Sequence, residues 1–369
     1  MNVLVFNVGS TTLKFACIDR TTGQRMTGGI VDRIGQPDGD AATHSDAARI
    51  ALRRIGDTPF SAIGHRIVQG GDQFQQPTLV TPEVLVRLKQ LDSLAPLHNP
   101  SARTVVESLV DVAVPQTLVF DTAYFSTLSP VAYRYAIPEP YYREHGIRRY
   151  GFHGTSHQFV TQRALEFLDG DTASQKIISL HLGGGASMTA SIGGVAIDTS
   201  MGMTPLEGLV MATRCGDIDP AVPLYLIREV GMTATQVDTL LNKQSGLVGL
   251  CGSGDMRTVL QHCSAGDDAA TLAIDIYVRK IIKTIGSYYA ILGGLDALIF
   301  TAGVGEHSAE IRQRVTSPLS HLGIQVDSQL NQNHTGNIAD ITGINASVRT
   351  LVVATDEELA IARQVANHL

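Results

Sequence analysis

Short apolar runs alternate along the chain with longer stretches in which apolar residues recur at helical spacing. The first run, residues 3–6, ends in a polar turn of Asn, Gly, Ser and Thr and is followed by a second run at 13–18. Residues 177–182 and 186–192 repeat this order around three glycines, and a third run at 297–301 leads into a Gly-Val-Gly turn. Short apolar runs bounded by turn residues are typical of strands. The pattern therefore predicts two related α/β halves.

Helices are predicted between these runs. Thr-Pro-Glu at 81–83 and Asn-Pro at 99–100 each place a capping side chain and a first-turn proline ahead of apolar residues. Apolar residues within 274–292 keep to one helical face and predict a long core helix. Thr-Asp-Glu-Glu at 355–358 spells a capping box that would open the last helix. The polar stretch at 35–46 predicts a surface loop.

Length and composition are those of a globular protein with about two domains. The chain has 369 residues, of which 44% are hydrophobic and 17% charged. Its net charge of −7 provides no basic surface, so no nucleic-acid partner is expected. Four cysteines without a CxxC pair favour a reducing cytoplasm over a disulfide framework or a zinc ribbon. The sequence shows no signal peptide and no apolar run of about 18 residues, so no membrane association is expected.

The glycine turns could bind an anionic ligand such as a polyphosphate, because their backbone N–H groups are not obstructed by side chains. Lys14 and the hydroxyls of Ser10, Thr11 and Thr12 at the first turn favour phosphate. A tight hairpin also needs glycine when no ligand binds, so that alternative stays open. The chain contains neither GxxxxGK[ST] nor GxGxxG, which argues against the P-loop and Rossmann modes of phosphate binding.

Several charged residues follow glycines or apolar runs. Arg66 follows Gly-His and Arg214 lies in a Thr-Arg-Cys-Gly loop, where each guanidinium could clamp a carboxylate or a phosphate. A surface salt bridge is the alternative for either arginine. Asp121 ends an apolar run, a common position for a metal-binding or catalytic carboxylate and also for a turn cap. Glu357 lies in the first turn of the last predicted helix, where the helix dipole alone would stabilise it.

Two histidines, His153 and His157, have the HxxxH spacing of some zinc sites. No Glu follows the first histidine and no third ligand is nearby, which argues against zinc. Ser156 is expected to cap a helix, so the two rings would not share one helical face. Hydrogen bonding of His153 to an anion is the favoured interpretation, and a histidine satisfied within the core is the alternative.

Ten motifs then point to one family and extend along nearly the whole chain. They are NVGSTTLKF at 7–15, GHRIV at 64–68, LAPLHNP at 94–100, FDTA at 120–123, RYGFHGTSH at 149–157, HLG at 181–183, TPLEG at 204–208, TRCG at 213–216, FTAGVGE at 300–306 and EELAIA at 357–362. In these motifs the chain resembles the acetate kinase family of the actin-like ATPase superfamily, which includes hexokinase and Hsp70. The resemblance implies two actin-like (ribonuclease H-like) α/β domains with a nucleotide cleft between them. Residues 1–125 plus 359–369 would form the N-terminal domain, and 126–358 the nucleotide-binding domain.

The reaction implied by the resemblance is reversible transfer of the γ-phosphoryl group of ATP to acetate by direct in-line displacement, giving acetyl phosphate and ADP. Acetate is already ionised at pH 7 and needs no general base, so the difficulty is the approach of two anions. Arginines, a histidine and Mg²⁺ would neutralise this charge and hold the geometry. The family also implies a cytoplasmic homodimer that works toward acetyl-CoA biosynthesis.

The resemblance implies a role for each matched position. Arg66 and Arg214 would clamp the carboxylate and the transferring phosphoryl group, and His153 would donate a hydrogen bond to that group. Asn7 and Glu357 would hold Mg²⁺, or Mn²⁺ in its place. The other implied positions are Asp121 beside the metal and an arginine; His98 at the edge of the site; Val68, Leu97, Phe152 and Pro205 around the acetate methyl group; and Ser10, Thr12, Lys14, His181, Gly183, Gly184, Gly185, Asp255, Met256, Arg257, Gly303, Gly305 and Glu306 at the nucleotide.

Some positions depart from the family pattern. Gly184 stands where the family usually has Asn, which removes an amide near the phosphates and could alter the choice of phosphoryl donor. The bulk of Val68 favours acetate over longer acids, although one methylene discriminates by only about 1–3 kcal/mol. A propionate or butyrate kinase of the same fold is therefore the alternative enzyme. An assembly ATPase of the actin and Hsp70 kind is a further class, and it would leave Arg66 and Arg214 without a role.

Overall fold

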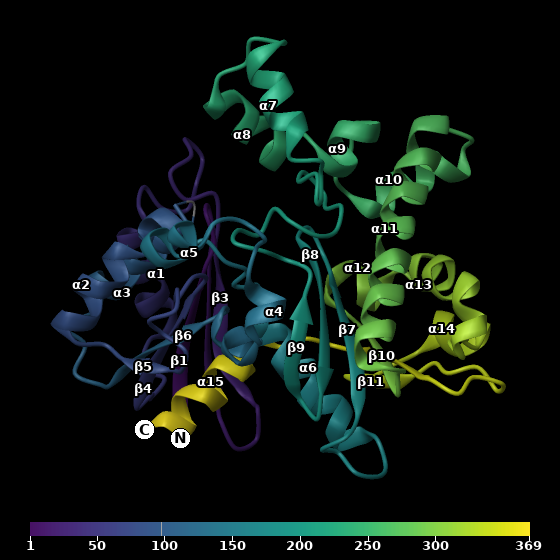
Figure 1. Ribbon diagram of the computed structural model, residues 1–369. Coiled ribbons are helices and arrows are strands. Elements are labelled where there is room, and N and C mark those ends of the chain that lie inside the picture. The colour runs from purple at the N-terminus through teal and green to yellow at the C-terminus, as the bar shows by residue number, and fades with distance from the viewer. Residues whose placement is uncertain (97) are drawn as a thin grey trace.

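Two mixed β-sheets of six strands each form the frame of the part of the chain that the structure describes (Figure 1). This structure is a computed structural model that describes residues 1–96 and 98–369. The strands of the first sheet are β1 (Asn2–Val8), β2 (Leu13–Asp19), β3 (Arg25–Val31), β4 (Ala62–Ile67), β5 (Thr78–Leu79) and β6 (Gln116–Phe120). Those of the second are β7 (Lys176–Leu182), β8 (Ala186–Ile192), β9 (Val195–Thr199), β10 (Ala297–Thr301), β11 (Ile338–Asp340) and β12 (Arg349–Val353).

The two sheets repeat one topology. The strand orders are β3-β2-β1-β4-β6-β5 and, read in the same direction, β9-β8-β7-β10-β12-β11. In each sheet three antiparallel strands come first, two strands then add parallel to the opening strand, and a short antiparallel strand closes the edge. The prediction of two related α/β halves is thus confirmed.

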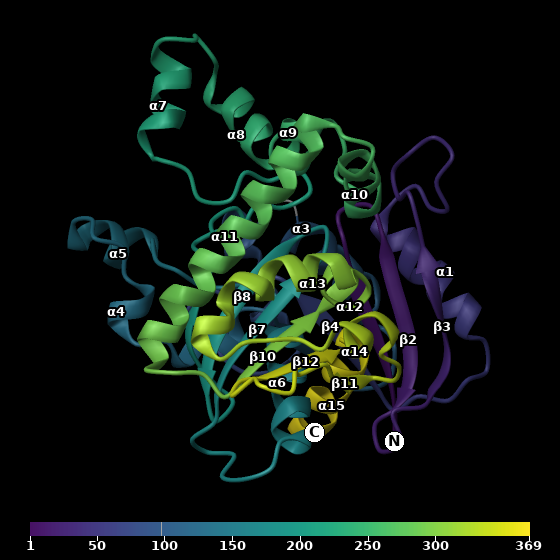
Figure 2. The same cartoon turned by 90° about the vertical axis from the view of Figure 1, so that its right-hand side faces the viewer.

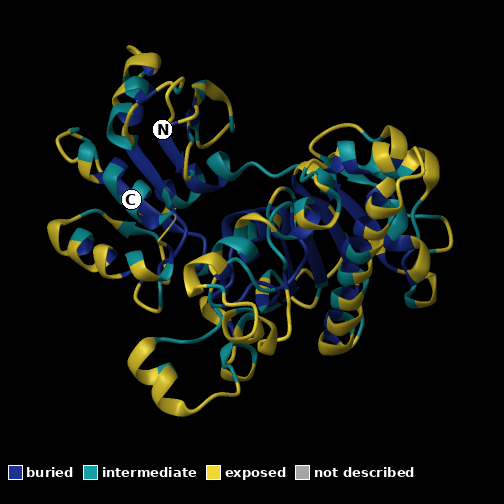
Figure 3. Ribbon diagram, turned by 90° about the horizontal axis from the view of Figure 1, so that it is seen from above, coloured by how far each residue is buried: buried dark blue, intermediate teal, exposed yellow. Residues whose placement is uncertain are grey.

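Helices cover both faces of each sheet, and the strands are the most buried elements (Figure 3). The helices that precede β7 in the chain are α1 (His44–Ile55), α2 (Pro82–Gln90), α3 (Asn99–Ser108), α4 (Pro130–Tyr133), α5 (Glu139–His145) and α6 (Gly154–Phe167). Those that follow are α7 (Ala221–Arg228), α8 (Ala234–Lys243), α9 (Gly246–Cys251), α10 (Met256–Ser264), α11 (Asp268–Leu292), α12 (Ala302–His307), α13 (Ala309–Thr316), α14 (Ser328–Asn333) and α15 (Glu357–His368). Short 3₁₀ helices lie at Asp92–Leu94, Ala123–Thr127 and Ser317–Leu322.

The long helix α11 packs on β7 and β8, and Figure 2 shows it crossing that sheet. Helix α6 contacts β7, β10 and β12, whereas α15 contacts β1, β2 and β4 of the first sheet. Because α6 and α15 also contact each other, they lie side by side between the two sheets. None of the helices that the structure describes is long and apolar enough to cross a membrane.

A glycine lets α15 approach the first sheet closely. A Cβ at Gly64 on β4 would lie 2.7 Å from Val365 Cγ2 and 2.8 Å from Ile361 Cγ2, closer than real Cβ contacts. Ile361 and Val365 bury their side chains against Val3 and Val5 of β1. The glycine of the Gly-His-Arg motif therefore fixes the distance between α15 and the strand that carries Arg66.

Several local predictions were wrong. Residues 303–305 do not form a turn but lie in α12, and residues 44–46 of the predicted loop are the start of α1. The capping box predicted at 355–358 would make Thr355 the cap of α15. The cap is instead Asp356, whose side chain accepts from the N–H of Leu359. Helix α6 begins at Gly154, so Ser156 is not its cap. Asn99 does not cap α3 but is its first residue, and His98 occupies the cap position. The buried side chain of Asn99 bonds the backbone N–H and carbonyl of Gln69.

Candidate active site

Four polar residues gather where the central strands of the first sheet end. Asn7 lies near the end of β1, Arg66 near the end of β4, and Asp121 directly after β6. These three strands are parallel neighbours, so their carboxyl ends share one edge, the usual position of a site in an α/β sheet. Glu357, the first residue of α15, joins them from the other end of the sequence.

Arg66 is the hub of this group. Its Nη2 and Nε donate to the carboxylate of Asp121 over 2.6 Å and 3.1 Å, and its Nη1 donates to Asn7 Oδ1 over 2.9 Å. Glu357 Oε2 lies 3.7 Å from Nη1 and accepts from Asn7 Nδ2 over 3.0 Å. Asp121 is 1% exposed and also accepts from the hydroxyl of Thr155 on α6. The guanidinium is thereby held in one orientation by groups from both halves of the molecule.

The charges of this group stabilise one another. Burial lowers the pKa of Arg66, but the carboxylates of Asp121 and Glu357 outweigh it, so its pKa is raised above the ordinary arginine value. Burial alone would raise the pKa of Glu357, yet Arg66 and His181 hold it below the usual range. Both side chains are therefore ionised at neutral pH.

Two stacked imidazoles lie beside these charges. The rings of His153 and His181 have centroids 4.2 Å apart and planes inclined by 20°. His153 precedes α6 with a left-handed backbone (φ 57°), and its Nδ1 lies 2.9 Å from the hydroxyl of Ser187 on β8. His181 Nδ1 lies 2.8 Å from the hydroxyl of Ser156. Burial is the main cause that lowers the pKa of both histidines, and the positive charge of Arg66 adds to it.

Arg214 reaches the same place from the second half of the chain. A Cβ at Gly185, in the hairpin between β7 and β8, would lie 3.1 Å from Arg214 Nη2 and 3.3 Å from His153 Nε2. Arg214 Nη1 donates to the carbonyl of Pro205 over 2.6 Å. Burial lowers its pKa. Gly185 of the hairpin thus lies beside both Arg214 and the Nε2 edge of His153.

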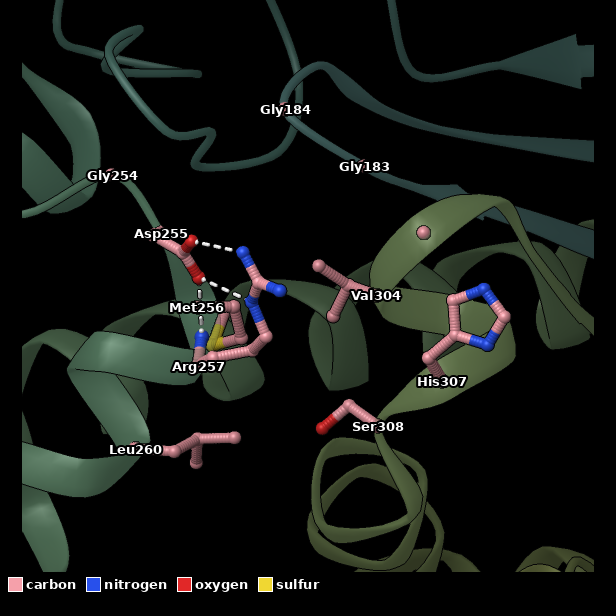
Figure 4. Close-up of a pocket in the computed structure, with 11 residues that line it drawn as sticks. Gly183, Gly184, Gly254, Asp255, Met256, Arg257, Leu260, Val304, His307 and Ser308 are labelled. Atoms are coloured by element: carbon pink, nitrogen blue, oxygen red, sulfur yellow. Dashed lines mark hydrogen bonds and ion pairs between the residues drawn. The ribbon is translucent and has the colours of Figure 1, made fainter.

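A cavity of about 630 Å³ opens beside this hairpin. Figure 4 shows the pocket between the hairpin, the start of α10 and α12. Asp255 caps α10 and pairs with Arg257, with its Oδ2 2.6 Å from Nη2 (Figure 4). Six of the expected nucleotide residues line it: Gly183, Gly184, Asp255, Met256, Arg257 and Gly303. Gly254, Leu260, Val304, His307 and Ser308 also line it and were not anticipated as nucleotide residues.

Other expected nucleotide residues lie outside that cavity. Glu306 turns away from it and accepts from the backbone N–H of Ala302 and Thr355, so it ties α12 to the loop before α15. The carbonyl of Gly305 accepts from the buried Arg312. Ser10 and Thr12 lie in the turn between β1 and β2. Lys14 lies on β2, where it is the cross-strand partner of Asn7 on β1. Gly185 lies beside Arg214 and His153, and His181 stacks on His153, so neither residue lines the cavity.

The expected methyl pocket is described in part. Val68 (8% exposed) and Phe152 (1% exposed) belong to one apolar cluster of the core. Pro205 is half-buried beside Arg214, and Leu97 lies outside the described residues. His98 is half-buried, and burial together with Arg66 and Arg214 lowers its pKa.

Some residues that shape the site were not among the expected ones. His157 is fully buried, and its two ring nitrogens each lie 2.7 Å from a serine hydroxyl, Ser179 and Ser187. Thr155 supports Asp121, and Glu358 accepts from Asn7 Nδ2 over 3.3 Å. A signal was present for the serines, because polar residues at every second position of two buried strands mark a polar sheet face.

Paired α/β sheets with one repeated topology, and a glycine hairpin beside clustered arginines, define a phosphotransferase of the actin-like ATPase class. A model of the acetokinase family matches residues 56–363. The acetate kinase of Streptomyces griseus is 45% identical over 390 aligned positions, which cover 98% of this chain and 95% of that protein. The solved acetate kinase of Porphyromonas gingivalis has a TM-score of 0.92 at 38% identity and covers 99% of both chains. A propionate kinase from Francisella tularensis has a TM-score of 0.93 at 38% identity over 98% of both chains.

The chain belongs to the acetokinase family. The predicted family, the actin-like fold and the enzyme class, a phosphotransferase with a carboxyl acceptor, are thereby confirmed.

Proposed function

We propose that this protein transfers the γ-phosphoryl group of ATP to acetate, reversibly, to give acetyl phosphate and ADP. The observation that carries the proposal is that the charges of Arg66 and Arg214 both act on His153, and that Arg214 and His153 adjoin Gly185 of the glycine hairpin, next to a cavity large enough for a nucleoside. Two cations and a hydrogen-bond donor are what the approach of a carboxylate to a phosphoryl group requires.

The reaction proceeds without a general base in this scheme. Acetate is ionised at neutral pH, and its oxygen attacks the γ-phosphorus directly while the bond to the β-phosphate oxygen breaks. Asp121 is occupied by Arg66 and Thr155, so it orients the guanidinium rather than accepting a proton. Arg66 and Arg214 bind the carboxylate and the phosphoryl oxygens, and His153 donates from Nε2 to the transferring group.

Mg²⁺ fits the residues present as an ion held mainly by water and by substrate phosphates. The described residues contain no group of three or more His, Cys, Asp or Glu that could enclose a metal. Asn7 and the ionised Glu357 offer oxygen ligands at the edge of the first sheet where Arg66 lies, and Mg²⁺ in kinases needs only one or two protein ligands. We propose that these two residues hold it, directly or through water, and that Mn²⁺ can replace it. When bound, the ion neutralises phosphate charge.

ATP would place its adenosine in the cavity between α10 and α12 and its phosphates along residues 183–185. Met256, Leu260 and Val304 give that cavity apolar walls suited to a base. Gly184 has open space around its Cα, since a Cβ there would meet nothing within 4 Å. The nucleotide would therefore meet backbone at the position where the family usually has Asn.

The choice of acid is proposed to be acetate. Val68 and Phe152 are buried in one apolar cluster, and the bulk of Val68 favours the methyl group of acetate over a longer chain. The propionate kinase among the similar structures keeps propionate as the alternative acceptor.

We also propose a homodimer, in the cytoplasm. Helix α7 buries none of its residues, and Leu224 (48%) and Tyr225 (62%) are exposed on it. Figures 1 and 2 both show α7 and α8 extending away from the two sheets. An apolar groove of about 390 Å³ at the base of this arm, lined by Val210, Leu240 and Ile276, could receive a second copy. All four cysteines are free thiols, which suits a reducing compartment.

The proposed domain division is 1–125 plus 359–369 and 126–358. It is supported by the packing of α15, whose apolar face covers β1 and β4 of the first sheet.

The test is to trap acyl phosphate with hydroxylamine in reactions that hold ATP, Mg²⁺ and acetate, propionate, butyrate or no acid. We expect product with acetate in excess over propionate, none without acid, and none from the Arg66→Ala variant. Arg103→Ala is the matched control, because Arg103 also pairs with two carboxylates, Asp92 and Glu107, away from the site. ATP hydrolysis that is indifferent to every acid would refute the proposal.

A further inference from the structure

A buried row of serine and histidine side chains lies behind His153. From the inside outward the row is Ser179, His157, Ser187 and His153, with contacts of 2.7, 2.7 and 2.9 Å. Ser187 and His157 are fully buried and Ser179 is 1% exposed, so water does not replace any of these contacts.

The fold explains the row. Ser179 on β7 and Ser187 on β8 point to the same face of the second sheet, since cross-strand partners Ser179–Thr189 and His181–Ser187 share a face. The first turn of α6 lies over this face and inserts His157 between the two serines.

Counting protons limits the row to two arrangements. Among the described residues, Ser187 Oγ contacts only His153 Nδ1 and His157 Nε2, and a hydroxyl has one proton to donate. If both rings donated to Ser187, its two lone pairs would accept both bonds, but its own buried proton would have no acceptor, which is costly. Every group is satisfied only when one ring donates to Ser187 and the other accepts from it. Burial lowers the pKa of both histidines, so both are neutral and each carries one ring proton. The tautomer of His153 is therefore linked to that of His157.

The two arrangements differ at the outer edge of His153. If Ser179 donates to His157 Nδ1, then His157 Nε2 donates to Ser187, and Ser187 donates to His153 Nδ1. The proton of His153 is then on Nε2, the atom next to Gly185 and Arg214. In the reverse arrangement Nε2 presents a lone pair, which would repel an anion.

We propose that Ser187 and His157 are positioning residues that hold the proton of His153 on Nε2, so that this atom is a fixed hydrogen-bond donor to the anionic substrate. The inference rests on the proposed function, because a bound anion is what selects this arrangement over its reverse. Donation from Ser187 to Nδ1 also polarises the ring and strengthens the Nε2–H donor.

The kinetic test compares two buried serines on the same face of β8. Ser187→Ala removes the link, whereas Ser191→Ala removes a hydroxyl that lies outside the row, where it contacts the carbonyl of Ile177 and the side chain of Tyr124. We expect Ser187→Ala to lower kcat about tenfold with KM for acetate and ATP unchanged, as for an interaction made in the transition state, and Ser191→Ala to leave kcat unchanged. In a His153→Ala background, Ser187→Ala should lower kcat no further. Equal effects of the two serine variants, or an additive loss in that background, would overturn the proposal.

Two variants of His157 distinguish its role in placing a proton from its role in packing. His157→Gln keeps an N–H₂ group that can donate to Ser187, whereas His157→Leu keeps the bulk without a donor. We expect His157→Gln to retain more of the kcat than His157→Leu at equal melting temperature. The reverse order would contradict a role in proton placement.

A spectroscopic readout does not depend on turnover. In ¹⁵N-histidine-labelled protein saturated with inorganic phosphate, long-range ¹H–¹⁵N correlations report which ring nitrogen of His153 carries the proton, with His153→Gln for assignment. We expect one tautomer with the proton on Nε2 in the wild type and a mixture in Ser187→Ala. A wild-type proton on Nδ1 would refute the inference, while a failure of the acetate reaction alone would refute only the proposed function.

Discussion

His153 and His181 stack almost parallel at the centre of the site, with their ring centroids 4.2 Å apart. Two imidazolium rings at this separation would repel each other, and each ring also faces the charge of Arg66. Since burial, the neighbouring ring and the arginine all disfavour protonation of His153, this ring of the stack is neutral. His153 is thus a neutral hydrogen-bonding group flanked by permanent cations.

The first prediction concerns stability against pH. The pKa of His65 is lowered to about 4 by burial, and those of His153, His157 and His181 are also lowered. The unfolded chain therefore takes up protons first as pH falls through about 6.5, and the free energy of unfolding decreases there, by up to about 1.4 kcal/mol per histidine per pH unit. Urea unfolding at several pH values measures the slope of the free energy of unfolding against pH.

His157→Gln should lower this slope by the equivalent of about one proton taken up on unfolding. His368→Gln is the control, because His368 is exposed. Stability that is constant down to about pH 5 would contradict the prediction.

A second prediction addresses the carboxylate behind Arg66. Asp121→Asn removes the charge that orients the guanidinium and leaves Arg66 poorly compensated. We expect kcat to fall about 100-fold and the free energy of unfolding by about 3 kcal/mol. Steady-state kinetics and urea unfolding measure these changes. Asp92→Asn is the control, because it weakens the partly exposed pair with Arg103. It should change kcat by less than about twofold and the free energy of unfolding by less than about 1 kcal/mol.

A third prediction uses neighbouring glycines. Gly185→Ala would place a Cβ 3.1 Å from Arg214 Nη2 and 3.3 Å from His153 Nε2, so one of the two side chains must move. We expect kcat to fall about tenfold at saturating substrates, because small misplacements of positioning groups reduce the rate. Gly184→Ala, whose Cβ would meet no protein atom within 4 Å but would face the proposed phosphates, should raise KM for ATP and change kcat at saturation less than about twofold. Equal losses in both variants would show that hairpin flexibility, and not this contact, matters.

A fourth prediction concerns the acid. Val68→Ala enlarges the apolar cluster that Val68 shares with Phe152. We expect the ratio of kcat/KM for propionate to that for acetate to rise about tenfold, the effect of one methylene in an apolar pocket. Val105→Ala, a buried truncation in the core of the first half, should leave the ratio unchanged. An unchanged ratio in Val68→Ala would place the methyl pocket elsewhere.

A fifth prediction concerns assembly. Leu224→Glu and Tyr225→Glu put charge on the exposed face of α7 and should convert a dimer into a monomer, as seen by light scattering after size exclusion. Ile344→Glu is the control, because Ile344 is 98% exposed and lies on none of the helices. A wild-type monomer, or variants that stay dimeric, would contradict an α7 interface.

The sequence predicted the strands better than the ends of the helices. Short apolar runs bounded by polar or glycine turns located the central strands to within about two residues, because strands buried on both sheet faces are continuously apolar. Helix caps failed where a candidate side chain had a tertiary partner. Asn99 bonds Gln69 instead of capping α3, and Ser156 faces His181 from within α6. Such long-range competition is invisible in a local pattern.

Some residues of the candidate site could likewise be predicted from the sequence, and others could not. Arg66, Asp121 and Glu357 could be singled out because charges that follow apolar strands or open helices stand out in a sequence. His157 and Ser187 could not be assigned, since their meaning depends on α6 lying over two paired strands. Motif resemblance supplied roles, whereas only the packing shows which side chains hold those residues in place.

The packing of α15 also affects how the chain is made. Its apolar residues cover a face of the first sheet formed by Val3, Val5, Ala62 and Val119. A ribosome delivers that face long before α15, which follows every strand of both sheets. During synthesis the face is exposed apolar surface of the kind that chaperones bind. Because α15 also begins with Glu357, the nascent protein gains its finished core and its full set of cleft charges in one late event, when this helix emerges and docks.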